Sequence, residues 1–202
     1  MIFYEPHARD RELLPHDPFK AIVAPRPIGW VSTIGPDGEL NLAPYSFFNA
    51  IGENPPMVAF SSSGAKHSST FAGGRGEFVW NLATWDLREQ MNLTSAKLSR
   101  GESEFEHAGL EAAPSRLVAP PRVAASPCAL ECRVVHAVAL DDVDGAPADQ
   151  YLVVGQVVGV HVDEAAIRDG RVDTAGLRPI ARCGYRGDYA VVDELFEMLR
   201  PD

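Results

Sequence analysis

Short stretches of β-branched and aromatic residues alternate with turn-forming residues through the first half of the chain. Apolar residues dominate Ile28–Ile34, the turn residues Gly35-Pro36-Asp37-Gly38 follow, and Glu39–Asn49 continues the pattern. Two such stretches around a glycine-rich turn predict a β-hairpin. After a proline break at 54–56, Met57–Ser61 predicts the next strand. Strands this short and this closely spaced are typical of a β-barrel or a β-sandwich.

Two longer strands are predicted in the second half, over Ala129–Leu140 and Tyr151–Val162. The first begins with alternating apolar and charged residues, as a half-buried strand does, and its His136 falls on the apolar face, where a core histidine is expected. The second is apolar on both faces, which predicts that both faces are covered. Its two glycines, Gly155 and Gly159, favour β-bulges or the close approach of another chain segment.

A helix is predicted over Asp86–Leu98, because Leu87 and Met91 can share one face and Asp86 can cap the start. Residues 99–127 are polar, rich in proline and too long for a plain connection, so we expect them to lie over the barrel or over a partner. Residues 1–18 are charged and carry three prolines. We therefore expect an N-terminal arm over residues 1–18 and a single domain over residues 19–202.

Composition narrows the classes of function. Of the 202 residues, 46% are hydrophobic and 23% are charged, and the net charge is −10. An acidic balance disfavours binding to nucleic acid, for which a basic face is the usual signature. The first 20 residues lack the apolar core of a secretory signal and no run reaches the ~18 apolar residues of a membrane span, so we expect a cytoplasmic protein without membrane contact. Cys128, Cys132 and Cys183 suit reduced thiols in structural positions.

Several kinds of catalytic site find no support in the residue pattern. The six histidines are scattered without the spacing of a ligand pair, so we expect no metal. The chain has no Gly-x-Ser-x-Gly elbow and no Gly-x-Gly-x-x-Gly fingerprint. Neither an acyl-transfer triad nor a Rossmann nucleotide site is therefore predicted.

A serine-rich turn is the strongest chemical signal. Ser61-Ser62-Ser63-Gly64 stands just ahead of Lys66 and His67, and further hydroxyls follow in 68–70. Hydroxyls, a cation and a glycine where a strand meets a helix suit a bound phosphate, because N–H groups at a helix start point at an anion. The alternative is an ordinary N-capped helix after a polar loop.

The order of several short motifs resembles the flavin reductase-like proteins with the FMN-binding split barrel, including the flavoredoxin-like subgroup. The pieces are Arg26-Pro27-Ile28-Gly29-Trp30, Asn41-Leu42-Ala43-Pro44-Tyr45-Ser46-Phe47-Phe48-Asn49, Pro55-Pro56-Met57, Ser61-Ser62-Ser63, Phe78-Val79-Trp80-Asn81-Leu82 and Leu177-Arg178-Pro179-Ile180-Ala181-Arg182-Cys183-Gly184-Tyr185. The resemblance runs from about Phe19 to about Tyr189 and implies a mainly β, split β-barrel fold with a few flanking helices.

The resemblance also implies a site for FMN, with FAD as the alternative. The resemblance implies that Ser46–Asn49 lie along the flavin ring and that Ser61–Ser68 surround the ribityl chain and phosphate, while Arg182 and Tyr185 come from across a dimer. The full set of implied flavin-binding residues is Arg26, Ser46, Phe47, Phe48, Asn49, Ser61, Ser62, Ser63, Lys66, His67, Ser68, Arg182 and Tyr185. Taken without the resemblance, Phe47, Phe48 and Trp30 would also suit the core, and the two arginines would suit the surface. The family often carries an acid where this chain has His67.

The implied activity is flavin reduction by NAD(P)H, with reduced flavin supplied to a partner oxygenase or another acceptor. The resemblance also implies a homodimer. Because the flavin carries the chemistry, we expect no catalytic side chain. Two alternatives stay open: an FMN-bound electron-transfer protein, as in flavoredoxin, and a flavin-binding module without redox turnover.

Overall fold

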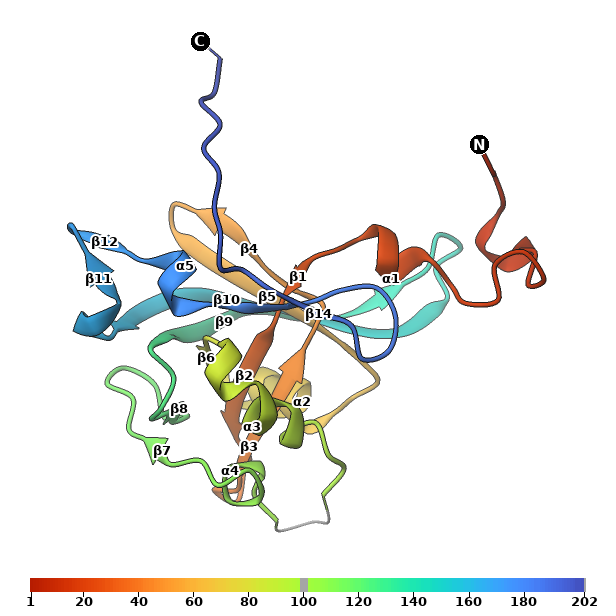
Figure 1. Ribbon diagram of the computed structural model, residues 1–202. Helices are drawn as coiled ribbons and strands as arrows, with labels where there is room; N and C mark the ends of the chain where they lie inside the picture. The colour runs from red at the N-terminus through yellow and green to blue at the C-terminus, as the bar shows by residue number, and fades with distance from the viewer. Residues whose placement is uncertain (99–101, 202) are drawn as a thin grey trace.

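The computed structural model describes residues 1–98 and 102–201 and is dominated by one seven-stranded antiparallel sheet (Figure 1). Its strand order is β3-β2-β6-β9-β10-β5-β4. The strands are β2 (Gly29–Ile34), β3 (Leu40–Tyr45), β4 (Phe48–Glu53), β5 (Pro56–Ser63), β6 (Glu77–Asn81), β9 (Cys128–Asp141) and β10 (Pro147–Val162). The outermost strands β3 and β4 follow each other in the chain, and β3 also contacts β5, so the sheet curls until its two edges meet near Ser46 and Phe47.

Shorter elements flank this sheet. The short strands are β1 (Arg26–Pro27), β7 (Ala112–Ala113), β8 (Arg122–Val123), β11 (Ile167–Arg168), β12 (Arg171–Val172), β13 (Ile180–Arg182) and β14 (Tyr189–Val191). The helices are η1 (Pro6–Ala8), α1 (Phe19–Ile22), α2 (His67–Arg75), η2 (Trp85–Leu87), α3 (Arg88–Leu93), α4 (Glu104–His107), η3 (Glu164–Ala166) and α5 (Thr174–Leu177). Strands β1, β13 and β14 form a small sheet that brings the C-terminal part of the chain beside the start of β2.

Strand β2 is buried on both faces and divides the core in two. Trp30 packs on one side with Leu42 and Met91, whereas Val31 packs on the other side with Phe60 and Phe78. Helix α2 packs across β2 and also contacts β9 and β10. Gly76, with φ of +76°, ends this helix in the left-handed conformation that glycine adopts without strain.

The predicted strands are present with one correction, and so are the predicted bulges. The stretch Glu39–Asn49, expected to continue as one strand, divides at Ser46-Phe47 into β3 and the start of β4. The register between β9 and β10 shifts beside both Gly155 and Gly159. A Cβ on Gly155 would lie 2.4 Å from the ring of Phe78, so that position requires glycine for close packing. The expectation of a core histidine at His136 is wrong, because β9 extends past the buried core beyond Val134 and its residues 135–141 are exposed on both faces.

The helix predicted over 86–98 is shorter than expected. It is two short pieces, η2 and α3, and Asp86 lies inside η2 instead of capping it. Leu87 at their junction leaves the helical region, and Thr94 ends α3 because its hydroxyl donates to the carbonyl of Met91 and accepts from the Trp30 indole. Side-chain hydrogen bonds of this kind compete with continued helix.

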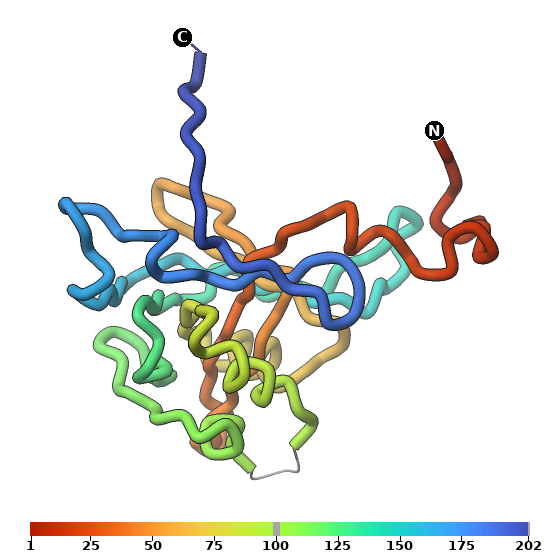
Figure 2. The backbone as a smooth tube through the Cα atoms, in the orientation of Figure 1, coloured from red at the N-terminus to blue at the C-terminus, as the bar shows by residue number. Residues whose placement is uncertain are grey.

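The described part of the predicted cover, residues 102–127, does lie over the sheet, with Phe105 and Val123 in the core; residues 99–101 lie outside the described ones. Coverage of β10 is partial, because Val153 and Val154 are buried while Val160 and Val162 are exposed. Both chain ends project from the body (Figure 2). Within residues 1–98 and 102–201, no helix is long and apolar enough to cross a membrane.

Candidate functional site

The turn between β5 and α2 presents unpaired backbone donors. Gly64, with φ of +74°, is tied down by its N–H to the carbonyl of Asp149, and the N–H of Lys66 returns to the carbonyl of Gly64. The first hydrogen bond inside the helix runs from the N–H of Thr70 to the carbonyl of Lys66. The N–H groups of residues 67–69 precede that bond and have no carbonyl one helical turn earlier. They therefore form a donor cluster suited to an anion.

Several hydroxyls of this turn support it from within. Ser68 is almost fully buried, and its hydroxyl accepts from the Asn41 amide at 2.8 Å. The hydroxyl of buried Ser62 donates to the carbonyl of Gly64, and that of Ser69 donates to the carbonyl of Lys66. These serines fix the shape of the turn, so its free donors are mainly the backbone N–H groups and the side chain of Lys66.

A cavity of about 620 Å³ opens over this turn. Its walls are the end of β3, the end of β5, the start of α2 and residues 94–98; the predicted residues among its lining are Ser46, Phe47, Ser61, Ser62, Ser63, Lys66, His67 and Ser68. His67 stacks on Phe71 at 5.2 Å with the rings parallel, which holds its imidazole at the rim. Within the described residues, no carboxylate lies within ion-pairing distance of Lys66, so its charge is available to a ligand.

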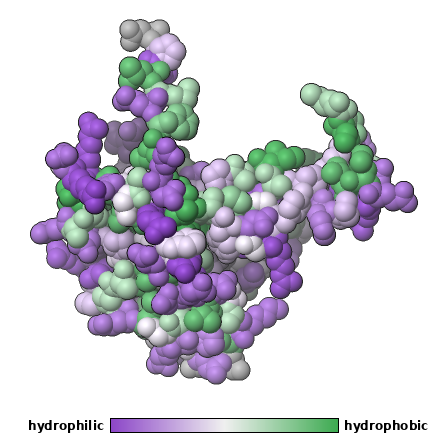
Figure 3. All heavy atoms as spheres, viewed as in Figure 1, coloured by the Kyte–Doolittle hydropathy of each residue, from purple (hydrophilic) through white to green (hydrophobic). Residues whose placement is uncertain are grey.

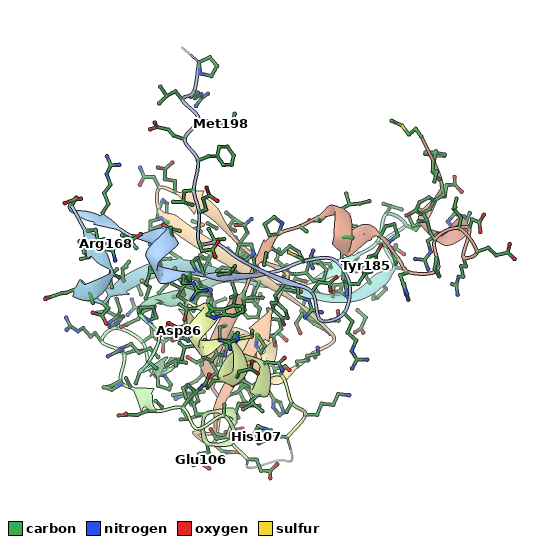
Figure 4. All side chains as sticks on the ribbon, viewed as in Figure 1. Asp86, Glu106, His107, Arg168, Tyr185 and Met198 are labelled. Atoms are coloured by element: carbon green, nitrogen blue, oxygen red, sulfur yellow. The ribbon has the colours of Figure 1, made fainter. Side chains whose placement is uncertain are left out.

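A second cavity, of about 700 Å³, adjoins the first and shares Lys20 and Ser46 with it. It contains the other predicted arginines and tyrosine: Arg26, Arg182 and Tyr185 all line it. Figure 4 shows Tyr185 on the loop between β13 and β14. The N-terminal segment supplies the opposite wall, where His16 lies against the Tyr185 ring at 5.7 Å.

The predicted residues in the second cavity are not equally available. Arg26 is buried and its guanidinium donates to the carbonyls of Lys20, Val23 and Cys183, so it holds the segments around β1 together. Arg182 donates to the Tyr189 hydroxyl at 2.9 Å and stays half-exposed. A second donor of Arg182 reaches the carbonyl of Tyr185 at 3.4 Å. Arg26 therefore has a structural role in the cavity wall, whereas Arg182 is the more exposed guanidinium of the two.

Two predicted residues lie outside both cavities. Phe48 stacks on Trp80 with ring centroids 5.5 Å apart, and it sits so close to Gly29 that a Cβ there would come within 2.8 Å of it. It is a core aromatic, whereas its neighbour Phe47 lines the first cavity. The Asn49 side chain is exposed and accepts from the N–H of Ala50.

The structure adds residues that the motifs did not single out. Tyr45 lies beneath the turn; burial raises the pKa of its hydroxyl, and the hydroxyls of Ser68 and Ser62 only partly offset this. Asn41 holds Ser68, and Lys20 joins the two cavities. Asn41 and Tyr45 stand inside a quoted motif at period two, so strand alternation could have placed them on one face, but Lys20 carried no such signal.

Comparison with known proteins agrees with this architecture. The family model described as a flavin reductase like domain matches residues 23–176. An uncharacterized protein of Deinococcus radiodurans is 40% identical over 192 residues, covering 89% of this chain and 82% of that protein. Nitrilotriacetate monooxygenase component B from Bacillus cereus superposes with a TM-score of 0.86 at 32% identity, covering 98% of each chain. A split-barrel protein of the flavin reductase type from Shewanella frigidimarina superposes with a TM-score of 0.80 at 24% identity, covering 90% of this chain and 89% of that one.

The family match covers most of the chain, and the relatives are covered over most of their own length. The resemblance deduced from the motifs is therefore confirmed, together with the mainly β, split-barrel fold. This chain belongs to the family of flavin reductase like domains.

Proposed function

We propose that this protein binds FMN in the first cavity and reduces flavin with NAD(P)H. The observation that supports this most is the pairing of an anion-binding helix start with an adjoining aromatic-walled cavity. The N–H groups of residues 67–69 and Lys66 suit the phosphate, and Phe47 borders the space from which a ring would extend. FMN is the flavin that ends in a single phosphate, so it suits one donor cluster.

The chain's own residues would bind and orient. Lys66 and the start of α2 neutralise the phosphate, and Phe47 supplies a flat apolar wall. Ser46 lies where the first and second cavities meet, so its backbone can contact a ring edge from either. When bound, FMN supplies the redox chemistry by accepting a hydride from NAD(P)H, which leaves reduced flavin and the oxidised dinucleotide. No general base is needed from the protein.

The reduced flavin would be delivered to a partner oxygenase. The Bacillus cereus relative is component B of a monooxygenase, and this chain spans 98% of it at 32% identity. The two cavities are open to solvent, which suits exchange of a ligand.

The decisive experiment is anaerobic mixing of the FMN-loaded protein with NADH and with NADPH, followed by absorbance. Excess free FMN consumed over many turnovers supports a reductase. Bleaching by dithionite or by a protein donor, with no response to either dinucleotide, would replace the reductase with an electron carrier. Absence of any FMN binding would reject the proposal as a whole.

The placement of the phosphate is tested by combining Lys66→Ala with Ser62→Ala. Loss of charge-assisted contacts should weaken FMN binding by about 1–3 kcal/mol in a fluorescence titration. Arg171→Ala removes one positive charge from the exposed β12 strand and is the matched control. An unchanged FMN affinity in the double variant would place the phosphate elsewhere.

We also propose a homodimer, because apolar side chains remain uncovered in one chain. Val135 and Val138 of β9 are exposed, and so are Leu195, Phe196, Met198 and Leu199. Figure 3 shows hydrophobic residues along the projecting C-terminal segment. A second copy is the simplest cover for them. Light scattering that gives the monomer mass of 21.9 kDa while FMN stays bound would contradict this.

A further inference from the structure

A third cavity, of about 370 Å³, borders the first two and has a distinct charge. It shares Pro44, Ser46 and Ser95 with the first cavity, and Arg182 and Arg186 with the second. Two guanidinium groups line it, and no carboxylate does. In a chain with a net charge of −10, this local excess of positive charge indicates an anionic ligand.

Arg186 lies on a turn whose own hydrogen bonds leave its guanidinium without a partner among the described residues. The Tyr185–Asp188 turn is closed by its own hydrogen bonds: the N–H of Asp188 donates to the carbonyl of Tyr185, and the N–H of Tyr185 donates to the Asp188 carboxylate. Gly187, with φ of +93°, permits the tight bend. The only acid in the turn is thus occupied by backbone, and within residues 1–98 and 102–201 Arg186 has no ion pair or hydrogen bond.

We infer that the third cavity binds the adenosine end of the dinucleotide and that Arg186 selects NADPH over NADH. This inference rests on the proposed reductase function. In Rossmann sites, NADH is selected by a carboxylate that accepts from the ribose 2′-hydroxyl and the 2′-phosphate of NADPH is accommodated by an arginine. The same chemistry applies at any site, because a guanidinium pairs with a phosphate and a carboxylate repels it. In the part of the chain that the structure describes, the third cavity has arginines and no carboxylate, as a site for NADPH requires. It meets the flavin cavity at Ser46, so a dinucleotide seated there has its nicotinamide end on the flavin side.

Arg182 supports this site in a different way. Its guanidinium donates to the Tyr189 hydroxyl and lies 4.7 Å from the Tyr189 ring, so its position is fixed. A fixed guanidinium beside a free one suits a ligand with two phosphate positions, the pyrophosphate and the 2′-phosphate. Arg186, whose removal breaks no ion pair or hydrogen bond among residues 1–98 and 102–201, is the residue on which discrimination is tested.

The direct test is calorimetric titration with 2′,5′-ADP and 5′-AMP, which needs neither flavin nor turnover. Wild-type protein should bind 2′,5′-ADP at least about tenfold more tightly, as expected for a charge-assisted contact to the extra phosphate. Arg186→Ala should abolish that difference, Arg186→Lys should restore part of it, and Arg171→Ala should preserve it. Equal affinities in the wild type, or a difference that survives Arg186→Ala, would overturn the inference.

The kinetic test separates this inference from the function on which it rests. With flavin reduction as the assay, Arg186→Ala should lower kcat/KM for NADPH by about tenfold or more and leave that for NADH within about threefold. Turnover with NADH and NADPH at equal kcat/KM overturns the selectivity and leaves the reductase standing. No reduction by either dinucleotide overturns the reductase, and the nucleotide titration then still decides the role of Arg186.

Discussion

Two polar regions of this barrel are built in contrasting ways. At one, the Glu131 carboxylate is fully buried and accepts from the N–H groups of Arg116, Leu117 and Val118, and His161 lies 2.5 Å from it. At the other, the helix start at Lys66 offers N–H groups and a cation without partners. The first region satisfies a buried charge completely, and the second leaves donors for a ligand.

The contrast distinguishes polar groups that stabilise the fold from polar groups that are left to bind a ligand. Glu131 ties the 115–118 loop to the sheet, so its hydrogen bonds stabilise the fold. The turn at Ser61–Thr70 does the reverse, because the hydroxyls of Ser62 and Ser69 donate to the carbonyls of Gly64 and Lys66 and leave the N–H groups of residues 67–69 beside the first cavity. Mutations in the two regions should therefore act on different quantities, stability in one and ligand binding in the other.

The largest effect is expected from Glu131→Ala. It strands three backbone donors and a histidine, and breaking a buried pair of this kind costs about 3–5 kcal/mol of the free energy of unfolding. Glu77→Ala is the matched control, because Glu77 also accepts from the same loop, at Ala119, but is less buried and makes one bond. Urea unfolding of both variants measures the difference. Equal losses would show that the buried network has no special weight.

Phe47 and Phe48 allow the same contrast between stability and ligand binding to be tested at adjacent positions. Phe48→Ala removes a ring stacked on Trp80 in the core and should cost about 3–4 kcal/mol of stability. Phe47→Ala should cost less stability but weaken FMN binding by about 1 kcal/mol, through loss of the cavity wall. Denaturation together with FMN titration on both variants gives a crossed pattern. Parallel losses in the two assays would mean that the two rings do not differ in role.

Lowering the pH should remove the stabilising contribution of Glu131 to the fold. Burial by itself would raise the pKa of Glu131, but the hydrogen bonds from His161 and from the N–H groups of Arg116 and Leu117 outweigh it and lower the pKa. A carboxyl whose pKa is lowered by folding stabilises the folded state at every pH above its ordinary pKa of 4.5. That stabilisation is lost as the pH falls from 4.5 through the lower pKa of the folded state. Unfolding free energies measured from about pH 6 to pH 3 should fall less steeply in Glu131→Gln than in the wild type. Identical slopes would remove Glu131 as the cause.

Sequence reasoning captured what depends on local pattern and missed what depends on tertiary contact. Turn residues and alternation predicted the strands, and the glycines predicted the bulges at Gly155 and Gly159. Alternation alone could not show that β9 leaves the buried core beyond Val134, which exposes His136. The motifs predict one role for Phe47 and Phe48, because only the packing of Phe48 against Trp80 and Gly29 distinguishes the two rings.

The smallest effect is expected at Tyr45, which lies between the core and the turn. Its ring packs on Phe60 at 4.9 Å, so Tyr45→Phe keeps the packing and removes only the hydroxyl beside Ser68 and Ser62. We expect a loss of about 0.5–1.5 kcal/mol of stability, the usual net value of one hydrogen-bonding group. Because burial raises the pKa of Tyr45 above 10.0, its neutral form stabilises the fold below that value and the contribution disappears as the pH rises through the folded value. The wild type should thus lose stability above about pH 10 more steeply than Tyr45→Phe, and parallel alkaline profiles would show that the hydroxyl is not held neutral by the fold.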